Sequence, residues 1–200
     1  MATNAMTTKM QEPDIRWKLP DRGRVGMYGL IGAETAIFTI FVVAYLFYLG
    51  KSPSGPTPKE VLEPPILFSV CLLSSSLTIH AAVKRLRQGR TVSFAVWWLA
   101  TILLGGAFLY GTASEWHRLI YVDGLTISTN MFGTTYYSLV GLHGFHVVVG
   151  LTALSLVMLL ACFGVINAKH AERLDVLSLY WHFVDVVWVV VFTVVYVIGR

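Results

Sequence analysis

The sequence predicts an all-α membrane protein whose five transmembrane helices pack as one bundle. Hydrophobic residues make up 56% of the 200 residues and charged residues only 13%, whereas a soluble domain usually carries about 25% charged residues. The apolar residues are gathered into five runs, and a helix needs about 20 such residues to cross the hydrocarbon core of a bilayer. We expect helices throughout, because lipid offers no hydrogen-bond partner to an open strand edge.

A polar segment, residues 1–25, precedes the first predicted span, which runs over about 26–49. The polar segment has no short apolar core followed by a small-residue cleavage site, so it is not interpreted as a signal peptide. The second span, about 64–83, starts at a proline pair, and the third covers about 92–112. Residues 50–65 are rich in proline, glycine and serine, which predicts an extended connection without regular structure.

The last two predicted spans complete the bundle. The fourth, about 131–165, is longer than one crossing requires, so it should tilt or project beyond the membrane. The fifth, about 176–198, contains a valine-rich run that would favour a strand in water but must be helical in lipid. No internal repeat is visible, which disfavours an inverted-repeat transporter. Residues 26–200 are therefore expected to form a single domain.

Basic residues predict the orientation of the bundle. Eleven of the 15 lysines and arginines lie in the N-terminal segment or in the connections after the second and fourth spans, and four lie on the opposite side. Cytoplasmic segments carry the excess of basic residues, so the N-terminus is expected in the cytoplasm and the C-terminus outside. This topology accounts for the formal net charge of +4 without nucleic acid as a partner.

Glu34 is an acidic residue within the first span. It lies about 12 Å along the helix from the start of that span. An isolated carboxylate is costly in hydrocarbon, so Glu34 should be either protonated or paired. Two interpretations are open: a proton-exchanging or regulatory carboxyl, or a protonated acid that hydrogen-bonds a neighbouring helix and stabilises packing.

His143 and His146 stand three residues apart in the fourth span, so they share one face of a helix. Gly141, Gly144 and Gly150 in the same stretch permit close helix approach. One interpretation is a haem or metal site, and the other is a pair of interhelical hydrogen-bonding histidines in a tight helix pair. Because a haem needs room between two helices, the small residues favour direct contact.

His182 and Asp185 share a face of the fifth span by the same spacing, and Trp181 and Trp188 flank them. They could form a proton relay, or Asp185 could orient His182 and neutralise its charge. By the predicted orientation both lie in the cytoplasmic half of the bilayer, as Glu34 does. The three side chains could therefore contact one another.

Basic groups gather at the inner ends of the spans. His80 and Arg85 lie near the end of the second span, and His170 and Arg173 precede the fifth. They suit anionic lipid headgroups, but they also follow from topology alone. Nothing in the sequence forms a nucleotide site, a nucleophile with its base, or a two-metal carboxylate cluster, so we expect neither a catalytic residue nor a metal ligand in this chain.

Taken in order, the motifs of the five spans resemble subunit III of haem-copper terminal oxidases, the cytochrome c oxidase polypeptide III family, over almost the whole chain. The most specific is the run from Tyr180 to Trp188, Tyr-Trp-His-Phe-Val-Asp-Val-Val-Trp. The other spans carry these motifs: Arg24-Val-Gly-Met27 with Gly-Ala-Glu34-Thr-Ala-Ile-Phe38, Leu73-Ser-Ser-Ser-Leu-Thr78, Leu104-Gly-Gly-Ala-Phe108 through Glu115-Trp116, and Phe132-Gly-Thr with Gly141-Leu-His-Gly-Phe-His146. The family's buried glutamate that carbodiimides modify corresponds to Glu34.

The chain is similar to the short, five-helix form found in bacterial cytochrome c oxidases and in bo-type quinol oxidases. Longer members have two more N-terminal helices, which form one arm of a lipid-holding cleft. The chain also departs from the family's pattern at two positions: Thr112 stands where a glutamine is common, and Asp175 where a glutamate is usual.

The resemblance implies an accessory subunit of a multi-subunit oxidase in the bacterial cytoplasmic (inner) membrane. Such a subunit binds no haem or copper, which sit in partner subunits. It contacts subunit I directly and joins subunit II and other oxidase subunits. Its implied roles are to support proton uptake, to protect the active site during dioxygen reduction, and to hold structural phospholipids.

Other functions stay open at this point. The chain could serve a bo-type quinol oxidase rather than a cytochrome c oxidase. A membrane electron carrier could hold b-type haem through His143 or His146 with His182. A stand-alone proton-coupled transporter could use Glu34 and Asp185.

Overall fold

The computed structural model describes residues 22–52 and 55–199, and within them it contains helices and no strand. Five of these helices are long and apolar enough to cross a membrane, which confirms the predicted all-α membrane fold. The elements in chain order are α1 (Arg22–Tyr48), α2 (Pro58–Val61), α3 (Ile66–Arg87), α4 (Thr91–Tyr121), α5 (Met131–Cys162), η1 (Ala168–His170), α6 (Ala171–Phe192) and the π-helical η2 (Thr193–Ile198).

Several helices extend beyond the predicted spans. α1 begins at Arg22, so the last residues of the expected polar segment are helical, while residues 1–21, with Lys9, Arg16 and Lys18, lie outside the described part of the chain. α4 continues nine residues past position 112 to Tyr121. It can do so because residues 113–123 include no glycine or proline. The next residue, Gly124, adopts a positive φ of 67° and follows the end of the helix. The single domain over 26–200 stays a prediction.

The connection between α1 and α3 contains the short helix α2, contrary to the expected absence of regular structure. Pro58 opens α2, a position at which proline suits a helix because its missing N–H would be unpaired there anyway. The backbone N–H of Thr57 donates to the Glu60 carboxylate at 2.9 Å. This hydrogen bond holds the pKa of Glu60 below its usual value. The proline-rich composition had indicated a segment without regular structure. Proline is also compatible with the first turn of a helix, and Pro58 occupies that position here.

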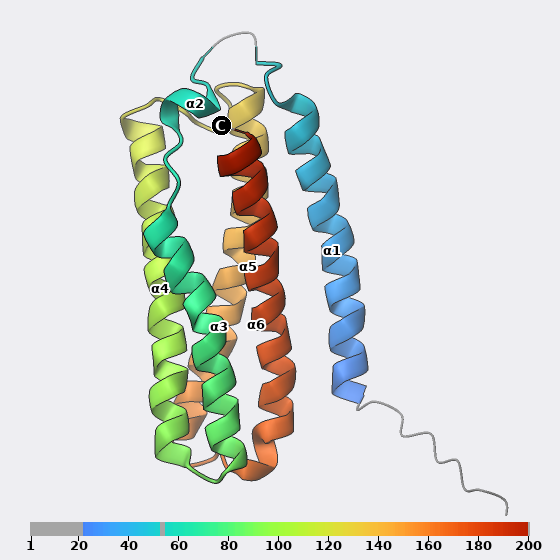
Figure 1. The fold of residues 1–200 in the computed structure, drawn as a ribbon, viewed down its shortest axis with the longest axis vertical. Coiled ribbons are helices and arrows are strands. Elements are labelled where there is room, and N and C mark those ends of the chain that lie inside the picture. The colour runs from blue at the N-terminus through green and yellow to red at the C-terminus, as the bar shows by residue number, and fades with distance from the viewer. Residues whose placement is uncertain (1–21, 53–54, 200) are drawn as a thin grey trace, which may run out of the picture.

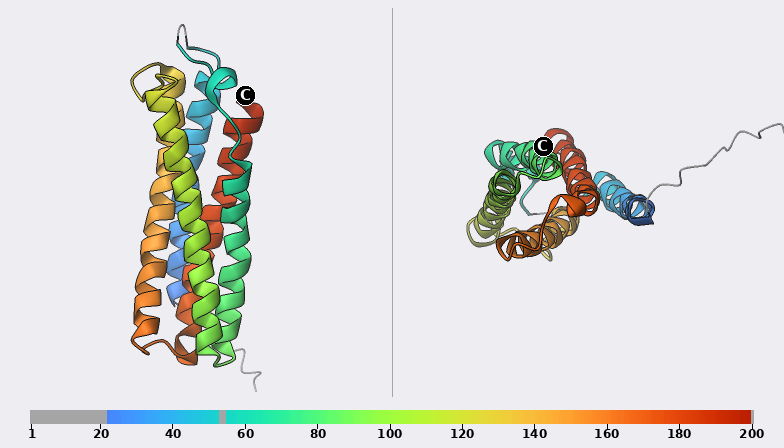
Figure 2. Two further views of the ribbon diagram at one scale, coloured as in Figure 1. Left: turned by 90° about the vertical axis from the view of Figure 1, so that its left-hand side faces the viewer. Right: turned by 90° about the horizontal axis from the view of Figure 1, so that it is seen from below.

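Helices α3, α4, α5 and α6 form a four-helix bundle, and α1 lies outside it along one side (Figures 1 and 2). α1 packs against α5 and α6. Phe38 and Tyr45 are its fully buried residues, and most of its other apolar side chains are exposed. With so little of α1 buried in the chain, its polar contacts with the bundle matter for where it sits.

Three fully buried tryptophans, Trp98, Trp181 and Trp188, fill the bundle interior. Trp98 donates its indole N–H to a backbone carbonyl of α5 at 2.9 Å. On α6, Trp181 donates to Ser75 Oγ at 2.7 Å and Trp188 donates to Ser69 Oγ at 3.0 Å. A buried donor without a partner costs about 1–3 kcal/mol, so the serines of α3 favour this one register of α6.

The two ends of the bundle carry the charge asymmetry that the sequence predicts. The start of α1, the α3–α4 connection and η1 lie at one end, and α2 and the C-terminus lie at the other (Figure 1). The first end holds the basic residues at the ends of α1, α3 and the α5–α6 connection. Which end faces the cytoplasm stays a prediction from the positive-inside rule.

Candidate functional site

Glu34 on α1 contacts His146 on α5. The distance from Glu34 Oε2 to His146 Nε2 is 3.1 Å, and the side chains are 21% and 8% exposed, respectively. Phe38, one turn further along α1, packs its ring on the imidazole with the centroids 5.1 Å apart. The sequence indicated both polar residues. It also allowed contact of Glu34 with His182 and Asp185, but Glu34 hydrogen-bonds His146 instead.

The hydrogen bonds around His146 determine how many protons the Glu34–His146 pair holds. His146 Nδ1 lies 2.8 Å from the carbonyl oxygen of Leu142, and because a carbonyl only accepts, Nδ1 carries a hydrogen. One further proton then occupies the contact between Nε2 and Oε2. It rests either on Glu34, as a neutral pair, or on His146, as an ion pair. The pair therefore joins α1 to the bundle through one shared proton.

A second cluster joins α3 to α6 through Ser76. Ser76 Oγ lies 2.8 Å from His182 Nδ1, and the Ser76 hydroxyl donates to Asp185 Oδ2. Asp185 is 3% exposed, and its other carboxyl oxygen has no partner among the described residues. His182 and Asp185 were indicated by their spacing. Ser76 was not, because nothing within one helix reveals which side chain faces it from another.

His143 belongs to neither cluster. It is 0% exposed, and neither ring nitrogen has a hydrogen-bond partner within the part of the chain that is described. Its ring stacks on Trp188 at 5.0 Å and meets Phe108 edge-on at 5.7 Å. The expected pair of hydrogen-bonding histidines therefore applies to His146, whereas His143 packs among aromatic rings. The four residues His143, His146, His182 and Asp185 do not form one network.

The glycines of α5 explain part of this packing. A Cβ atom at Gly150 would lie 2.8 Å from ring carbons of Trp181, and one at Gly141 would lie 3.3 Å from Trp116. A Cβ atom at Gly144 would meet nothing within 4 Å. Gly150 and Gly141 therefore permit the close approach that the sequence indicated, and Gly144 does not serve this purpose within the described residues.

Asp175, the residue that departs from the family pattern, ties three helices together at the basic end. Its carboxylate contacts Arg24 of α1 at 2.7 Å and Arg87 of α3 at 2.8 Å. Sequence reasoning gave no role to this contact, because the three residues are far apart along the chain. The Arg24–Asp175 ion pair and the Glu34–His146 pair therefore attach α1 to the bundle at two points along its length.

Replacing Asp175 with asparagine is expected to destabilise the chain by about 1 kcal/mol, because both arginine pairs are partly exposed to solvent. The loss should shrink as salt is added, since screening already weakens exposed pairs. Thermal unfolding of the detergent-solubilised protein at low and high salt measures it. Glu172→Gln makes the same change of charge at an exposed position of α6 and serves as the control. A loss that is independent of salt would contradict the ion-pair account.

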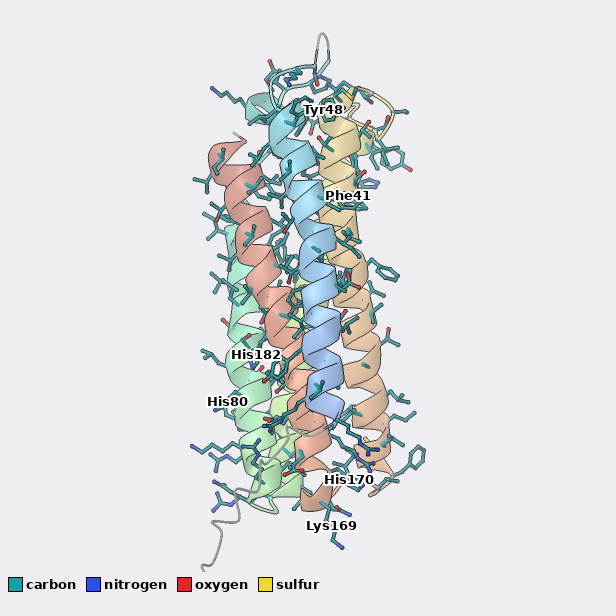
Figure 3. The ribbon with its side chains drawn as sticks, turned by 90° about the vertical axis from the view of Figure 1, so that its right-hand side faces the viewer. Phe41, Tyr48, His80, Lys169, His170 and His182 are labelled. Atoms are coloured by element: carbon teal, nitrogen blue, oxygen red, sulfur yellow. The ribbon has the colours of Figure 1, made fainter. Side chains whose placement is uncertain are left out.

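The four candidate headgroup residues lie at the same end. His80 and Arg173 are exposed, and Arg85 and His170 are half-buried. The backbone N–H of Asn167 donates to His170 Nδ1 at 3.2 Å, so this histidine also helps to cap η1. Figure 3 shows His80 and His182 on neighbouring helices, with His80 nearer the end that carries Lys169 and His170. Their contact with lipid stays a prediction.

The opposite end holds a half-buried carboxyl, that of Glu115, which the sequence indicated only as part of a family motif. The Tyr196 hydroxyl donates to both carboxyl oxygens of Glu115, at 2.9 and 3.0 Å. One turn on, Arg118 pairs with Glu63 at 2.8 Å and donates to the carbonyl of Val61 at 2.9 Å. These contacts link α4 to the C-terminal turn and to the α2 connection.

The histidines are not arranged as a shared ligand set. Among residues 22–52 and 55–199, no group of three or more histidine, cysteine, aspartate and glutamate side chains is placed to hold a metal ion. Both nitrogens of His146 are engaged, by Leu142 and Glu34, so a haem iron would have to displace one of these contacts. The arrangement joins helices through polar side chains.

Comparison with known proteins gives a consistent result. The family model described as cytochrome c oxidase subunit III matches residues 23–200. Cytochrome c oxidase subunit 3 of Bacillus sp. (strain PS3) is 35% identical over 177 residues, which cover 88% of this chain and 85% of the relative. Cytochrome bo(3) ubiquinol oxidase subunit 3 of Pseudomonas aeruginosa is 32% identical over 176 residues, 87% and 84% of the two chains. Quinol oxidase subunit 3 of Bacillus subtilis is 29% identical over 184 residues, 90% of each.

Proposed function

This chain belongs to the cytochrome c oxidase subunit III family and is a multi-pass subunit of a haem-copper oxidase complex, and we propose that within this complex it is an accessory subunit without a redox centre of its own. In this role it packs on subunit I, beside subunit II and the other subunits, in the bacterial inner membrane. It binds no haem or copper itself. The complex, rather than this chain, reduces dioxygen and pumps protons.

One observation carries this proposal: Glu34, His146, His182 and Asp185 are each hydrogen-bonded to another side chain, whereas His143 packs among aromatic rings. Glu34 bonds His146, Ser76 joins His182 to Asp185, and their contacts link different helices. Polar groups inside a membrane are costly unless partners satisfy them. Their pairing suits a subunit that stores or passes protons and stabilises a neighbour. A b-haem carrier would need His182 and a histidine of α5 on either side of the iron, but both nitrogens of His146 are engaged, and His143 is enclosed by the rings of Trp188 and Phe108.

We propose cytochrome c as the electron donor of the complex. The support is the higher identity to cytochrome c oxidase subunits, 35% against 32% and 29% for the two quinol oxidase subunits over similar lengths. A bo-type quinol oxidase is the second candidate, since its subunit is nearly as similar. The purified complex should oxidise reduced cytochrome c, and oxidation of a quinol with no activity on cytochrome c would favour the alternative.

A groove between α1 and α6 supports the proposed role in holding lipid. It has a volume of about 360 Å³ and is lined almost wholly by apolar side chains, among them Ile31 and Phe38 of α1 and Phe183 and Val187 of α6. Each buried methylene of an acyl chain contributes about 0.8 kcal/mol. The groove is therefore suited to one tail of a structural phospholipid whose headgroup lies near a basic end of the helices.

Glu34→Gln tests the proposed function. We expect the variant to assemble with a normal haem content and a dioxygen-reduction rate within about twofold of the parent, because Glu34 touches no redox centre. Its active lifetime during turnover should shorten and its carbodiimide labelling should disappear. Native mass spectrometry, haem spectra and repeated-turnover assays measure these effects. Loss of haem from the complex, or purification of the chain as a haem protein by itself, would contradict the proposal.

A further inference from the structure

We propose that Asp185, Ser76 and His182 form a second proton-exchange site, separate from the Glu34–His146 pair, in which a proton reaches the buried carboxyl of Asp185 through the imidazole and the hydroxyl. This inference rests on the proposed role of the subunit in proton uptake and assigns Asp185, Ser76 and His182 to that role. His80 is exposed on α3, one helical turn from Ser76. Glu34 was the residue that the family resemblance indicated, whereas this site comes from the contact between α3 and α6.

The first support is a continuous hydrogen-bonded path from a partly exposed group to a buried one. His182 is half-buried, and Asp185 is 3% exposed. Ser76 Oγ stands between them, 2.8 Å from His182 Nδ1 and hydrogen-bonded to Asp185 Oδ2. His182 Nε2, on the other side of the ring, makes no hydrogen bond to any residue that the structure describes. It is therefore free to accept a proton from outside the chain.

The second support is the chemistry of the three groups. Ser76 has one hydrogen and donates it to Asp185, so it must accept the Nδ1–H of His182. When His182 Nε2 takes up a proton, the Nδ1 proton can pass to Ser76 Oγ while the hydroxyl proton passes to Asp185 Oδ2. One proton enters at Nε2 and one appears on the carboxyl, and His182 and Ser76 are neutral again. The reverse sequence releases the proton.

The third support is that Asp185 has no cation beside it. No lysine or arginine among the described residues pairs with its carboxyl, and its Oδ1 is buried without a partner. A buried carboxylate without a compensating charge is costly. A path that delivers a proton to Asp185 would neutralise this charge and remove that cost. A group needed for packing alone would be better served by an uncharged side chain of the same size.

The charged and titratable groups around the site are few. From α3, His80 stands one helical turn from Ser76 and, with Asp175 of α6, lies within electrostatic range of His182. Figure 3 shows His80 and His182 on adjoining helices. Asp175 is already paired with Arg24 and Arg87. From α5, His143 lies against Trp188, one turn beyond Asp185. His80 is thus the exposed histidine that can collect protons for His182.

Infrared spectroscopy of the purified oxidase complex tests the site through hydrogen–deuterium exchange of the carboxylic acid. The C=O band that disappears in Asp185→Asn identifies the protonated side chain. We expect this band to shift on transfer to heavy water at least tenfold more slowly in Ser76→Ala and in His182→Phe than in the parent. Ser76→Thr keeps a hydroxyl and should restore fast exchange. Ser75→Ala, which loses the hydrogen bonds of Ser75 with Trp181 and with the carbonyl of Leu72 but leaves Ser76 in place, should exchange as fast as the parent.

Two results would overturn the proposal: a band that exchanges equally fast in Ser76→Ala, Ser76→Thr and the parent, or no C=O band that Asp185→Asn removes at any pH at which the complex is stable. Proton-uptake rates measured on the same samples separate this site from the proposed function. Slow exchange at Asp185 with unchanged uptake by the complex would leave the site standing and contradict the role of the subunit in uptake.

Discussion

Replacing Gly150 with leucine is expected to destabilise the bundle by about 2–4 kcal/mol, through overpacking and loss of a buried hydrogen bond. A Cβ atom there would lie 2.8 Å from Trp181, and a Cβ atom at Gly105 of α4 would lie 2.9 Å from the same ring. The ring therefore packs closely on glycines of two helices, and moving it aside would cost its hydrogen bond to Ser75. The fraction of oxidase that retains the subunit through detergent purification, with its melting temperature, measures the effect.

Gly144→Leu is the matched control, because it makes the same change on the same helix. A Cβ atom at Gly144 meets nothing within 4 Å. Glycine is about 0.8–1 kcal/mol less favourable in a helix than alanine, and leucine ranks just below alanine. This variant should keep the melting temperature of the isolated chain at or above that of the parent. If the Gly150→Leu and Gly144→Leu variants had the same melting temperature, the close contact of Trp181 with α5 would not limit stability.

Changing His146 to phenylalanine is expected to raise the rate of carbodiimide labelling at Glu34 about tenfold, which corresponds to about 1.4 kcal/mol. Wherever the shared proton rests, Oε2 is engaged by Nε2 in the parent, and the variant frees it. Phenylalanine preserves the packing with Phe38. α1 should also dock less firmly, because an unsatisfied buried group costs about 1–3 kcal/mol. Mass spectrometry of the labelled chain over time gives the rate.

His143→Phe provides the control for this prediction, since it introduces the same side chain three residues away on α5. His143 makes no hydrogen bond among the described residues and lies between Phe108 and Trp188. Labelling of Glu34 should therefore stay at the parent rate. Equal acceleration by both changes would show that labelling reports a general loosening of α5 rather than the loss of the Glu34–His146 contact.

The fold could be predicted from the sequence because membrane insertion acts on local composition. A run of apolar residues must become a helix wherever it lies in the bilayer, so five runs predicted five helices. The ends were less predictable. α4 continues to Tyr121 and α2 forms in a proline-rich segment, since both lie outside the predicted spans, where local turn chemistry rather than lipid decides the conformation.

The candidate site was predictable in its members but not in its pairings. Residues three apart on a helix are rotated by about 60° around its axis, which is enough for His146 to meet α1 while His143 meets α4 and α6. Spacing along one helix therefore predicted that the two histidines act as a pair, whereas they contact different helices. Ser76, the residue that bridges His182 and Asp185, stood in a run of three serines that differ only in the direction they face.

The amino-acid sequence by itself determined that the chain crosses a membrane as five helices, that acids and imidazoles lie within those helices, and which family its motifs resemble. Only the tertiary structure decided that Glu34 bonds His146, that Ser76 joins Asp185 to His182, and that Asp175 holds Arg24 and Arg87. The physical reason is distance along the chain. Glu34 and His146 are separated by 112 residues and Arg24 and Asp175 by 151, so these partners meet only where helix packing brings one face against another.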